Sequence, residues 1–268
     1  SKAEASREET VVANLALAQV TSDAVEAKDR LAREYEEFLV KVLRNTPAYG
    51  AELGEVQAID DNLRDVTRIA RTDTDVTMAL LGHFGQGRVI ALAHDAFINA
   101  NPDNLLFFEL AIKWASPKAQ AERVLYSVGH CEVVSFPSSA PYQHMVLPLK
   151  SMKNWDYEVA SIQDLSDSES LRGAALLIIG NAWASFSAAE VVSVVEYVRR
   201  GGAVLMAGLK WSFDGSPAAP GFQPCSFNDF SAGRQIARGR YPMNDIANRV
   251  GINFGQGNFD NLYKAPVN

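Results

Sequence analysis

The chain has 268 residues, of which 47% are hydrophobic and 21% are charged, and its formal net charge at pH 7 is −7. This length is enough for one α/β domain with additions or for two small domains. The acidic balance and the lack of a dense Lys/Arg block argue against a nucleic-acid partner, and no apolar run reaches the roughly 18–20 residues that span a bilayer.

The first 45 or so residues have a helical pattern. Ser22-Asp23 is typical of an N-terminal cap, and the apolar residues after it recur on one helical stripe. These are Leu31, Tyr35, Phe38, Leu39 and Val42. Asn45-Thr46-Pro47 ends the helix, because proline cannot continue the hydrogen-bond ladder. We expect this stripe to pack on the domain that follows; a surface that pairs with a partner helix is the alternative.

The hydrophobic period changes in the next part of the chain. Val76, Met78 and Leu80 alternate with polar or small residues, Gly85-Gln86-Gly87 turns the chain, and residues 88–93 are nearly continuous in apolar character. This pattern predicts a hairpin that leads into a buried strand. A helix capped near Asp103 or Asn104, with an apolar face that ends at Ala115, is expected next.

Strands and helices then alternate. Apolar runs that end at glycine or alanine predict strands over residues 123–128, 174–179 and 203–207. Ser187-Ala188-Ala189-Glu190 is a capping box, and the helix that it opens closes at Gly201-Gly202. A short helix over 242–249 and a last strand near 252–254 complete the chain.

Buried strands that alternate with capped helices imply parallel βαβ units. We therefore predict an α/β protein with a doubly wound, mostly parallel Rossmann/flavodoxin-like sheet and an N-terminal helical segment. We divide it into a helical segment over 1–48 and an α/β domain over 49–268.

Any ligand site in such a sheet lies at the carboxyl ends of its strands. The candidate ligand-binding residues found there are His94, Asp95, Asn181, Trp183, Lys210 and Trp211. The two tryptophans could form an aromatic platform for a sugar ring, or they could close the edge of the sheet. The His94-Asp95 pair could orient a proton transfer, but such pairs more often cap a loop through side-chain hydrogen bonds.

Cys131 is a weak candidate for a nucleophile. His130 is a poor base for it, since adjacent residues on an extended segment point apart, so His94 or His144 would have to serve. The other cysteine is Cys225. Two buried, reduced thiols are the favoured interpretation, and a single disulfide in an oxidising compartment is the alternative.

The sequence offers no motif for a metal or a cofactor. No cysteine or histidine has metal-ligand spacing, and no glycine-rich phosphate loop follows a strand. We therefore expect neither a metal nor a cofactor.

Several segments resemble a glutamine-amidotransferase-like domain that occurs in enhancin-type zinc metallopeptidases, which act on mucins and O-glycoproteins, and in TRP-channel-associated factors. The resemblance covers roughly residues 75–255 and rests on the order and spacing of its segments. The segments are Gly85–Phe97, Leu176–Trp183, Val195–Gly208, Tyr241–Asn244 and Gly251–Phe254.

The chain departs from this family pattern in two ways. True class I amidotransferases carry a cysteine in a Gly-x-Cys-x-Gly elbow, and the stretch from Gly180 to Ala184 has none. The zinc peptidases use His-Glu-x-x-His, and no histidine of this chain is followed by glutamate. The resemblance therefore implies a non-catalytic portion of such a peptidase.

What the resemblance implies is a degenerate accessory domain that binds substrate for, or supports, a following glycoprotein-directed peptidase domain. Its partners would be a glycan or glycoprotein and that domain, and it would be secreted, periplasmic or at the cell surface. The alternatives are a stand-alone carbohydrate-related enzyme of the trehalose-utilisation type and an interaction scaffold that docks through its helical segment.

Overall fold

The computed structural model describes the chain in seven parts. These are residues 19–41 (except 25, 28, 32 and 40), 53–70, 76–98, 110–115, 123–132, 158–215 and 239–259. The positions 1–18, Val42, Asp103, Asn104, His144 and Cys225, on which some of the expectations rest, lie outside the described residues.

The centre of the molecule is a seven-stranded sheet in the order β2-β3-β4-β8-β7-β5-β6. Its strands are β2 (Leu63–Ala70), β3 (Thr77–Phe84), β4 (Gly87–Leu92), β5 (Arg123–Ser127), β6 (Glu158–Ile162), β7 (Ala174–Gly180) and β8 (Ala203–Ala207). The pairs from β4 to β6 are parallel, whereas β2, β3 and β4 pair antiparallel. The fold is thus a mostly parallel, Rossmann/flavodoxin-like α/β sheet, as predicted.

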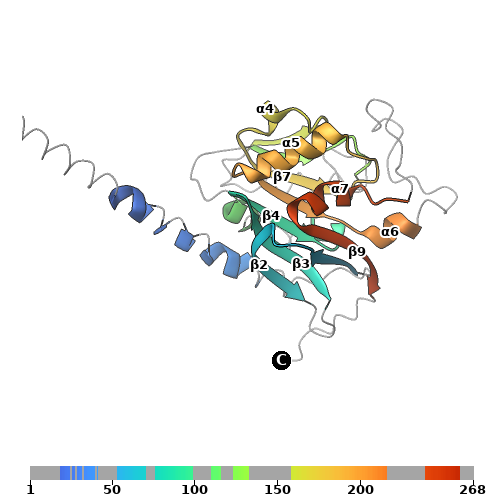
Figure 1. Ribbon diagram of the computed structural model, residues 1–268, viewed down its shortest axis with the longest axis horizontal. Coiled ribbons are helices and arrows are strands. Elements are labelled where there is room, and N and C mark those ends of the chain that lie inside the picture. The colour runs from blue at the N-terminus through green and yellow to red at the C-terminus, as the bar shows by residue number, and fades with distance from the viewer. Residues whose placement is uncertain are drawn as a thin grey trace, which may run out of the picture.

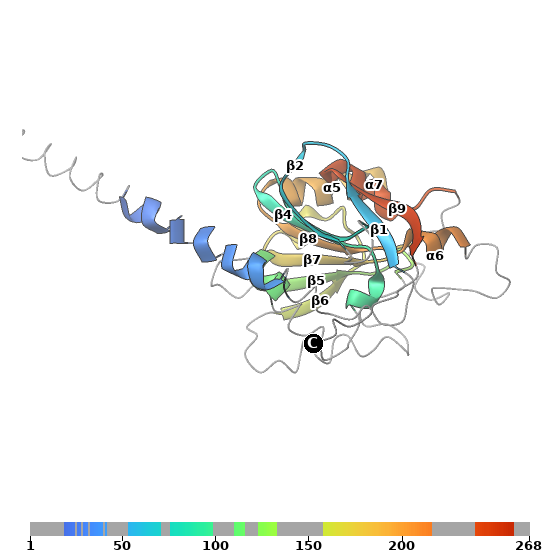
Figure 2. The same cartoon turned by 90° about the horizontal axis from the view of Figure 1, so that it is seen from below.

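Helices lie on both sides of this sheet. Helices α5 (Ala188–Arg199) and α7 (Met243–Ala247) lie on one side, and the helical residues 110–115 and the 3-10 turn η1 (Asp95–Ile98) on the other (Figures 1 and 2). The remaining helical elements are α4 (Ser168–Leu171), α6 (Lys210–Gly215) and η5 (Asn248–Val250).

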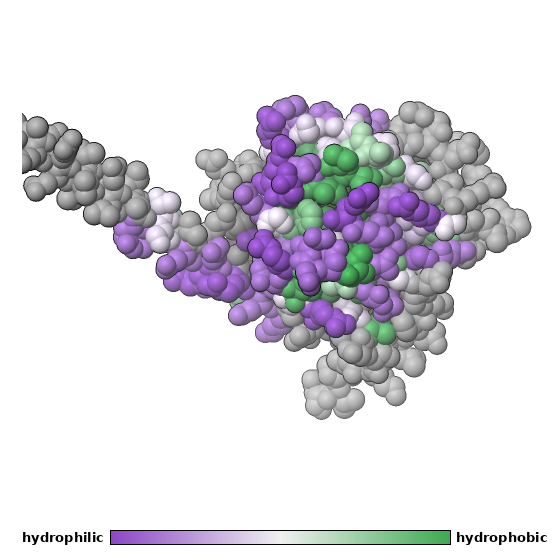
Figure 3. Space-filling view, in the orientation of Figure 1, coloured by the Kyte–Doolittle hydropathy of each residue, from purple (hydrophilic) through white to green (hydrophobic). Residues whose placement is uncertain are grey.

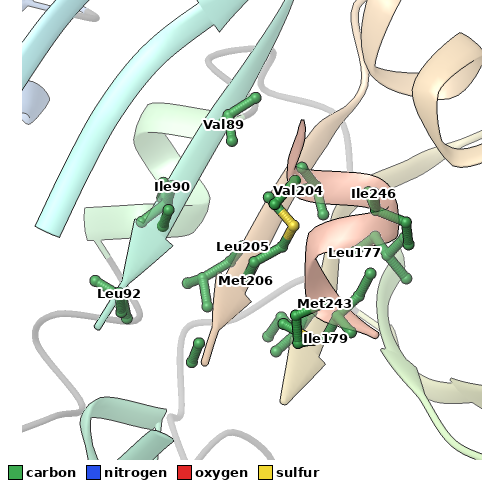
Figure 4. Close-up of a cluster of buried hydrophobic side chains, with 14 of the residues drawn as sticks. Val89, Ile90, Leu92, Leu177, Ile179, Val204, Leu205, Met206, Met243 and Ile246 are labelled. Atoms are coloured by element: carbon green, nitrogen blue, oxygen red, sulfur yellow. The ribbon is translucent and has the colours of Figure 1, made fainter. Parts of the chain in front are cut away.

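The core forms where the parallel strands meet these helices. The strands are apolar on both faces, as expected for strands covered from both sides. Met243 and Ile246 of α7 lie against Leu177 and Ile179 of β7 in this core (Figure 4). The predicted capping box starts α5: the Ser187 hydroxyl accepts a hydrogen bond from the Glu190 amide, and the Glu190 carboxylate accepts one from the Ser187 amide.

Three strands were not predicted from the sequence. β1 (Leu53–Ala58), β2 and β6 are short or amphipathic, and β2 carries a bulge near Asp65, whose φ is 51°. The predicted last strand exists as β9 (Ile252–Phe259), but it pairs antiparallel with β1 in a separate two-stranded sheet.

Among the described residues, the contacts of the N-terminal helix with the domain come from its last turns, which we call the anchor (residues 35–41). Leu39 is fully buried, and Glu36 accepts hydrogen bonds from the Thr67 hydroxyl at 2.5 Å and from Trp114 Nε1 at 3.2 Å. The ammonium of Lys113 lies 5.9 Å from the centre of the Tyr35 ring. These contacts fix the direction in which the helix leaves the domain.

The preceding residues 19–34, which we call the arm, project away from the sheet (Figures 1 and 2). Every described side chain of the arm is exposed, and Phe38 in the anchor is 58% exposed. The expectation that the whole stripe from Leu31 packs on the domain is therefore correct only for the anchor. Seven of the sixteen arm residues are charged, which favours the exposure of the arm to solvent.

A pair of neighbouring substitutions tests the anchor. We expect Leu39→Ala to lower the free energy of unfolding by about 2–4 kcal/mol, because it empties a filled core position. Phe38→Ala removes a larger but mostly exposed side chain and should change it by less than about 1 kcal/mol. Chemical denaturation of both variants measures the difference, and equal effects would contradict the anchor.

Candidate functional site

The carboxyl ends of β4 and β7 bring four of the six predicted ligand-binding residues together. Asn181 Nδ2 donates a hydrogen bond to Asp95 Oδ2 at 2.7 Å, and Trp183 Nε1 donates to Asn181 Oδ1 at 3.2 Å. His94 Nδ1 lies 3.0 Å from the other oxygen of Asp95. All four residues are buried, and we call them, together with Tyr241, the strand-end cluster.

Asn181 is the centre of this cluster. It follows the central strand β7 and has a φ of 51°, a conformation that asparagine tolerates better than most residues. Its amide hydrogen bonds to the carbonyl of Ala207 at the end of β8, at 2.7 Å, which ties the ends of two neighbouring strands together. The side chain is 1% exposed and therefore faces the protein and not solvent.

Tyr241 completes the cluster and was missed from the sequence. Its hydroxyl donates to Asn181 Oδ1 at 2.6 Å and accepts from the amide of Leu209 at 2.9 Å. Burial raises the pKa of Tyr241 well above its ordinary value, so its hydroxyl stays protonated and remains a donor. The sequence marked Tyr241 only as part of the resembling segment Tyr241–Asn244, and not as a site residue, because its bond to Asn181 spans 60 residues.

The two remaining predicted residues lie beside the cluster on α6. Lys210 pairs with Asp214 one turn further along the helix, with Nζ 2.5 Å from Oδ2. Lys210 and Trp211 are half-buried, in contrast to the buried residues of the strand-end cluster. Trp183, by contrast, is 1% exposed and stacks edge-on against Phe213, so it presents no open face to a sugar.

A second polar cluster lies at the ends of β5 and of the loop before α5. His130 is enclosed between two carboxylates: its Nδ1 lies 3.2 Å from Glu132 Oε1, and its Nε2 lies 2.9 Å from Glu190 Oε1. The Ser127 hydroxyl donates to Glu132 at 2.5 Å, and Phe186 stacks on the imidazole. We call these residues the His130 cluster.

The charges in this cluster support one another. Burial alone would lower the pKa of His130, but hydrogen bonds to Glu132 and Glu190 and the charges of both outweigh burial, and the pKa is raised. Burial would likewise raise the pKa of Glu132, but the bonds with His130 and Ser127 lower it. The raised pKa of His130 and the lowered pKa of Glu132 both favour an imidazolium that donates hydrogen bonds from its two ring nitrogens to carboxylates.

Cys131, the weak candidate nucleophile, is disulfide-bonded, and its φ is 56°. The favoured interpretation of two reduced thiols is therefore wrong for Cys131. A sulfur held in a disulfide has no thiolate to attack a substrate.

The part of the chain that the structure describes contains no group of three or more His, Cys, Asp or Glu side chains placed to hold a metal ion. Within the same residues, no helix has both the length and the apolar character needed to cross a membrane.

Comparisons with known proteins reveal a likeness of fold. No protein-family model matches the chain, and no curated protein does. Among solved structures, the IMPa metallopeptidase from Pseudomonas aeruginosa is similar with a TM-score of 0.52 and 16% identity, over 89% of this chain and 23% of that chain.

Two further IMPa structures give the same result. The structure of IMPa in complex with an O-glycopeptide has a TM-score of 0.51 at 15% identity, over 87% of this chain and 23% of that one. IMPa in complex with T-antigen has a TM-score of 0.51 at 17% identity, over 89% of this chain and 24% of that one. The chain thus spans about a quarter of the length of the proteins it resembles.

Proposed function

We propose that this chain is a non-catalytic accessory domain of a glycoprotein-directed zinc metallopeptidase, and a degenerate relative of the glutamine-amidotransferase-like domain. In this role it supports the peptidase and contacts the glycan part of its substrate. The observation that carries the proposal is that the Asn181 side chain is buried and hydrogen-bonded to other protein side chains. In an enzyme with this kind of sheet, the end of the same strand would present a reactive group.

The comparisons support the setting. Nearly the whole chain shares its fold with about a quarter of IMPa, whose structures include complexes with an O-glycopeptide and with T-antigen. The disulfide at Cys131 supports an oxidising location, which means secretion, the periplasm or the cell surface. An accessory domain that faces glycoproteins belongs in such a compartment.

The chemistry of the strand ends supports the absence of catalysis. A nucleophile must be reachable by substrate and must be activated by a neighbouring base. Asn181 is neither a nucleophile nor exposed, and its amide group is bonded to Asp95 and Tyr241. These side chains satisfy one another's hydrogen bonds and so tie together the ends of β4, β7 and β8. That role is structural.

We expect the glycan to contact the strand-end edge at α6. Lys210 and Trp211 in its first turn are the two of the six candidates that are only half-buried. An indole and an ammonium group suit a sugar, which has one apolar face and a rim of hydroxyls. Stacking on one indole contributes on the order of 1 kcal/mol, so the expected binding is weak, with a Kd of roughly micromolar to millimolar.

Titration of the chain with O-glycopeptides and with T-antigen, followed by tryptophan fluorescence and by chemical shifts, tests this proposal. We expect a saturable response that Trp211→Ala abolishes and Trp211→Phe retains. Val192→Ala, an exposed position on α5, is the control that should bind as the parent does.

The titration has two contrary outcomes. A flat response across the panel would remove glycan contact from the proposal and leave support of the peptidase. Cleavage of the glycopeptides by the chain alone, detected by mass spectrometry, would contradict the non-catalytic role itself.

A further inference from the structure

The arm carries an apolar seam that nothing in the described structure covers. Val20, Ala24, Ala27 and Leu31 are separated by four, three and four residues, which places them on one face of the helix. Val20 is 65% exposed and Leu31 is 38% exposed. Spacing of this kind is the pattern by which one helix packs along another.

An isolated helix of this length is only marginally stable in water. The domain anchors just its last turns, and the arm points away from the domain body (Figures 1 and 2). The face of the arm that Figure 3 shows is largely hydrophilic. Val20 and Leu31 are nevertheless exposed apolar side chains. A second helix along the seam would remove that apolar surface from water and stabilise the arm.

The charges beside the seam indicate what that second helix is. Asp23 and Arg30 both flank the seam and, with Ala27, line one open hollow of the arm. Asp23 accepts a hydrogen bond from Gln19, and Arg30 has no ion-pair partner among the described residues. Asp23 and Arg30 carry opposite charges and lie at similar distances along the helix on either side of Glu26. If a second copy of the helix runs antiparallel, its Arg30 therefore comes beside Asp23 of the first copy, and its Asp23 beside Arg30.

We propose that the arm pairs with the arm of a second copy of this chain in an antiparallel, two-fold symmetric contact. In that register Ala24 faces Ala27 of the second copy, and Val20 faces Leu31 of the second copy. Asp23 then lies beside Arg30 of the second copy, and symmetry repeats each contact. Small residues at the centre let the helices approach closely, and the larger side chains close both ends.

This arrangement also fits the position of the domain. The domain body lies at the C-terminal end of the arm (Figure 1), so antiparallel pairing places the two bodies at opposite ends of the contact. A parallel pair would bring both bodies to the same end. It would place Asp23 beside Lys28 but Arg30 beside Tyr35, and so would match only one of the two charges. The seam is short, so the contact is weak.

Sedimentation equilibrium of the whole chain tests the pairing. We expect the dimer fraction to rise with concentration between roughly 1 and 200 µM, as suits a short interface. Leu31→Glu should weaken the dimer at least tenfold. Val192→Glu places the same charge at an exposed valine of α5 and should leave the dimer unchanged.

Charge exchange tests the register. Asp23→Arg and Arg30→Asp should each weaken the dimer, because each places like charges together, and the double variant should restore it. Circular dichroism of each variant separates loss of pairing from loss of the helix. A chain that stays monomeric at the highest concentration, a dimer indifferent to Leu31→Glu, or a double variant no better than the single ones would overturn the proposal.

Discussion

Replacing His130 with alanine is expected to lower the free energy of unfolding by about 3–5 kcal/mol, the largest effect of any single substitution considered. The reason is that the imidazole lies between Glu132 and Glu190, at 3.2 Å and 2.9 Å, with all three side chains essentially buried. Without His130, two buried carboxylates face one another and have no cation between them. Urea unfolding at pH 6 measures the loss.

The same cluster makes the free energy of unfolding of the parent chain depend on pH, with one loss on the alkaline side and another on the acidic side. The pKa of His130 is raised in the folded state, so its contribution is complete below about pH 6.5 and is lost as the pH rises through the raised value. The pKa of Glu132 is lowered, so its contribution is present above about pH 4.5 and is lost as the pH falls through the lowered value. Stability contributed by the pair is therefore greatest in mildly acidic solution.

Two variants serve as controls for this prediction. Ser127→Ala removes the hydrogen bond to Glu132 and a longer contact, 3.4 Å, with His130 Nδ1, and should lower the unfolding free energy by about 1 kcal/mol. His83 is half-buried, and burial together with the charge of Arg88 lowers its pKa, so His83→Ala should leave the loss on the alkaline side in place. A His130→Ala variant within about 1 kcal/mol of the parent would show that the carboxylates are not held as charges.

Asn181→Ala is expected to lower the free energy of unfolding by about 3 kcal/mol. It removes one hydrogen bond from each of Asp95, Trp183 and Tyr241, and each of these groups is buried. It also places alanine at a φ of 51°, where asparagine is better tolerated. Thermal and urea unfolding, read with near-ultraviolet circular dichroism of Trp183 and Tyr241, would report the loss.

The control for Asn181 is Lys210→Ala, which removes an ion pair at the edge of the same region and should change stability by less than about 1 kcal/mol. If Asn181→Ala were as mild as this control, the strand-end cluster would not be a structural network. The edge would then have to be reconsidered as a ligand site whose polar groups are spared for a substrate.

The sequence predicted five strands of the central sheet, β3, β4, β5, β7 and β8, and missed its two edge strands. β4, β7 and β8 are continuous apolar runs that end at a turn, which is a local signal. β2 and β6 are edge strands with mixed composition, and their pairing depends on neighbours that are distant in sequence. The separate pairing of β1 with β9 likewise arises only once the chain has folded.

The candidate site was predicted in part. The rule that sites gather at carboxyl ends of parallel strands correctly placed Asp95 and Asn181 together. The rule says nothing about burial, so it could not predict that the Trp183 side chain is buried. Glu190 was recognised as a capping residue, but its bond to His130 spans 60 residues and leaves no local pattern.

The most direct test of the accessory-domain proposal is the mass of the native protein that carries these residues, read together with the coding sequence after Asn268. Immunoprecipitation from the source cells and intact mass spectrometry supply the mass. We expect a protein well above the 29.2 kDa of this chain, with a His-Glu-x-x-His segment in the same reading frame. A native protein of 29.2 kDa, or a longer one that carries no such segment, would contradict the proposal.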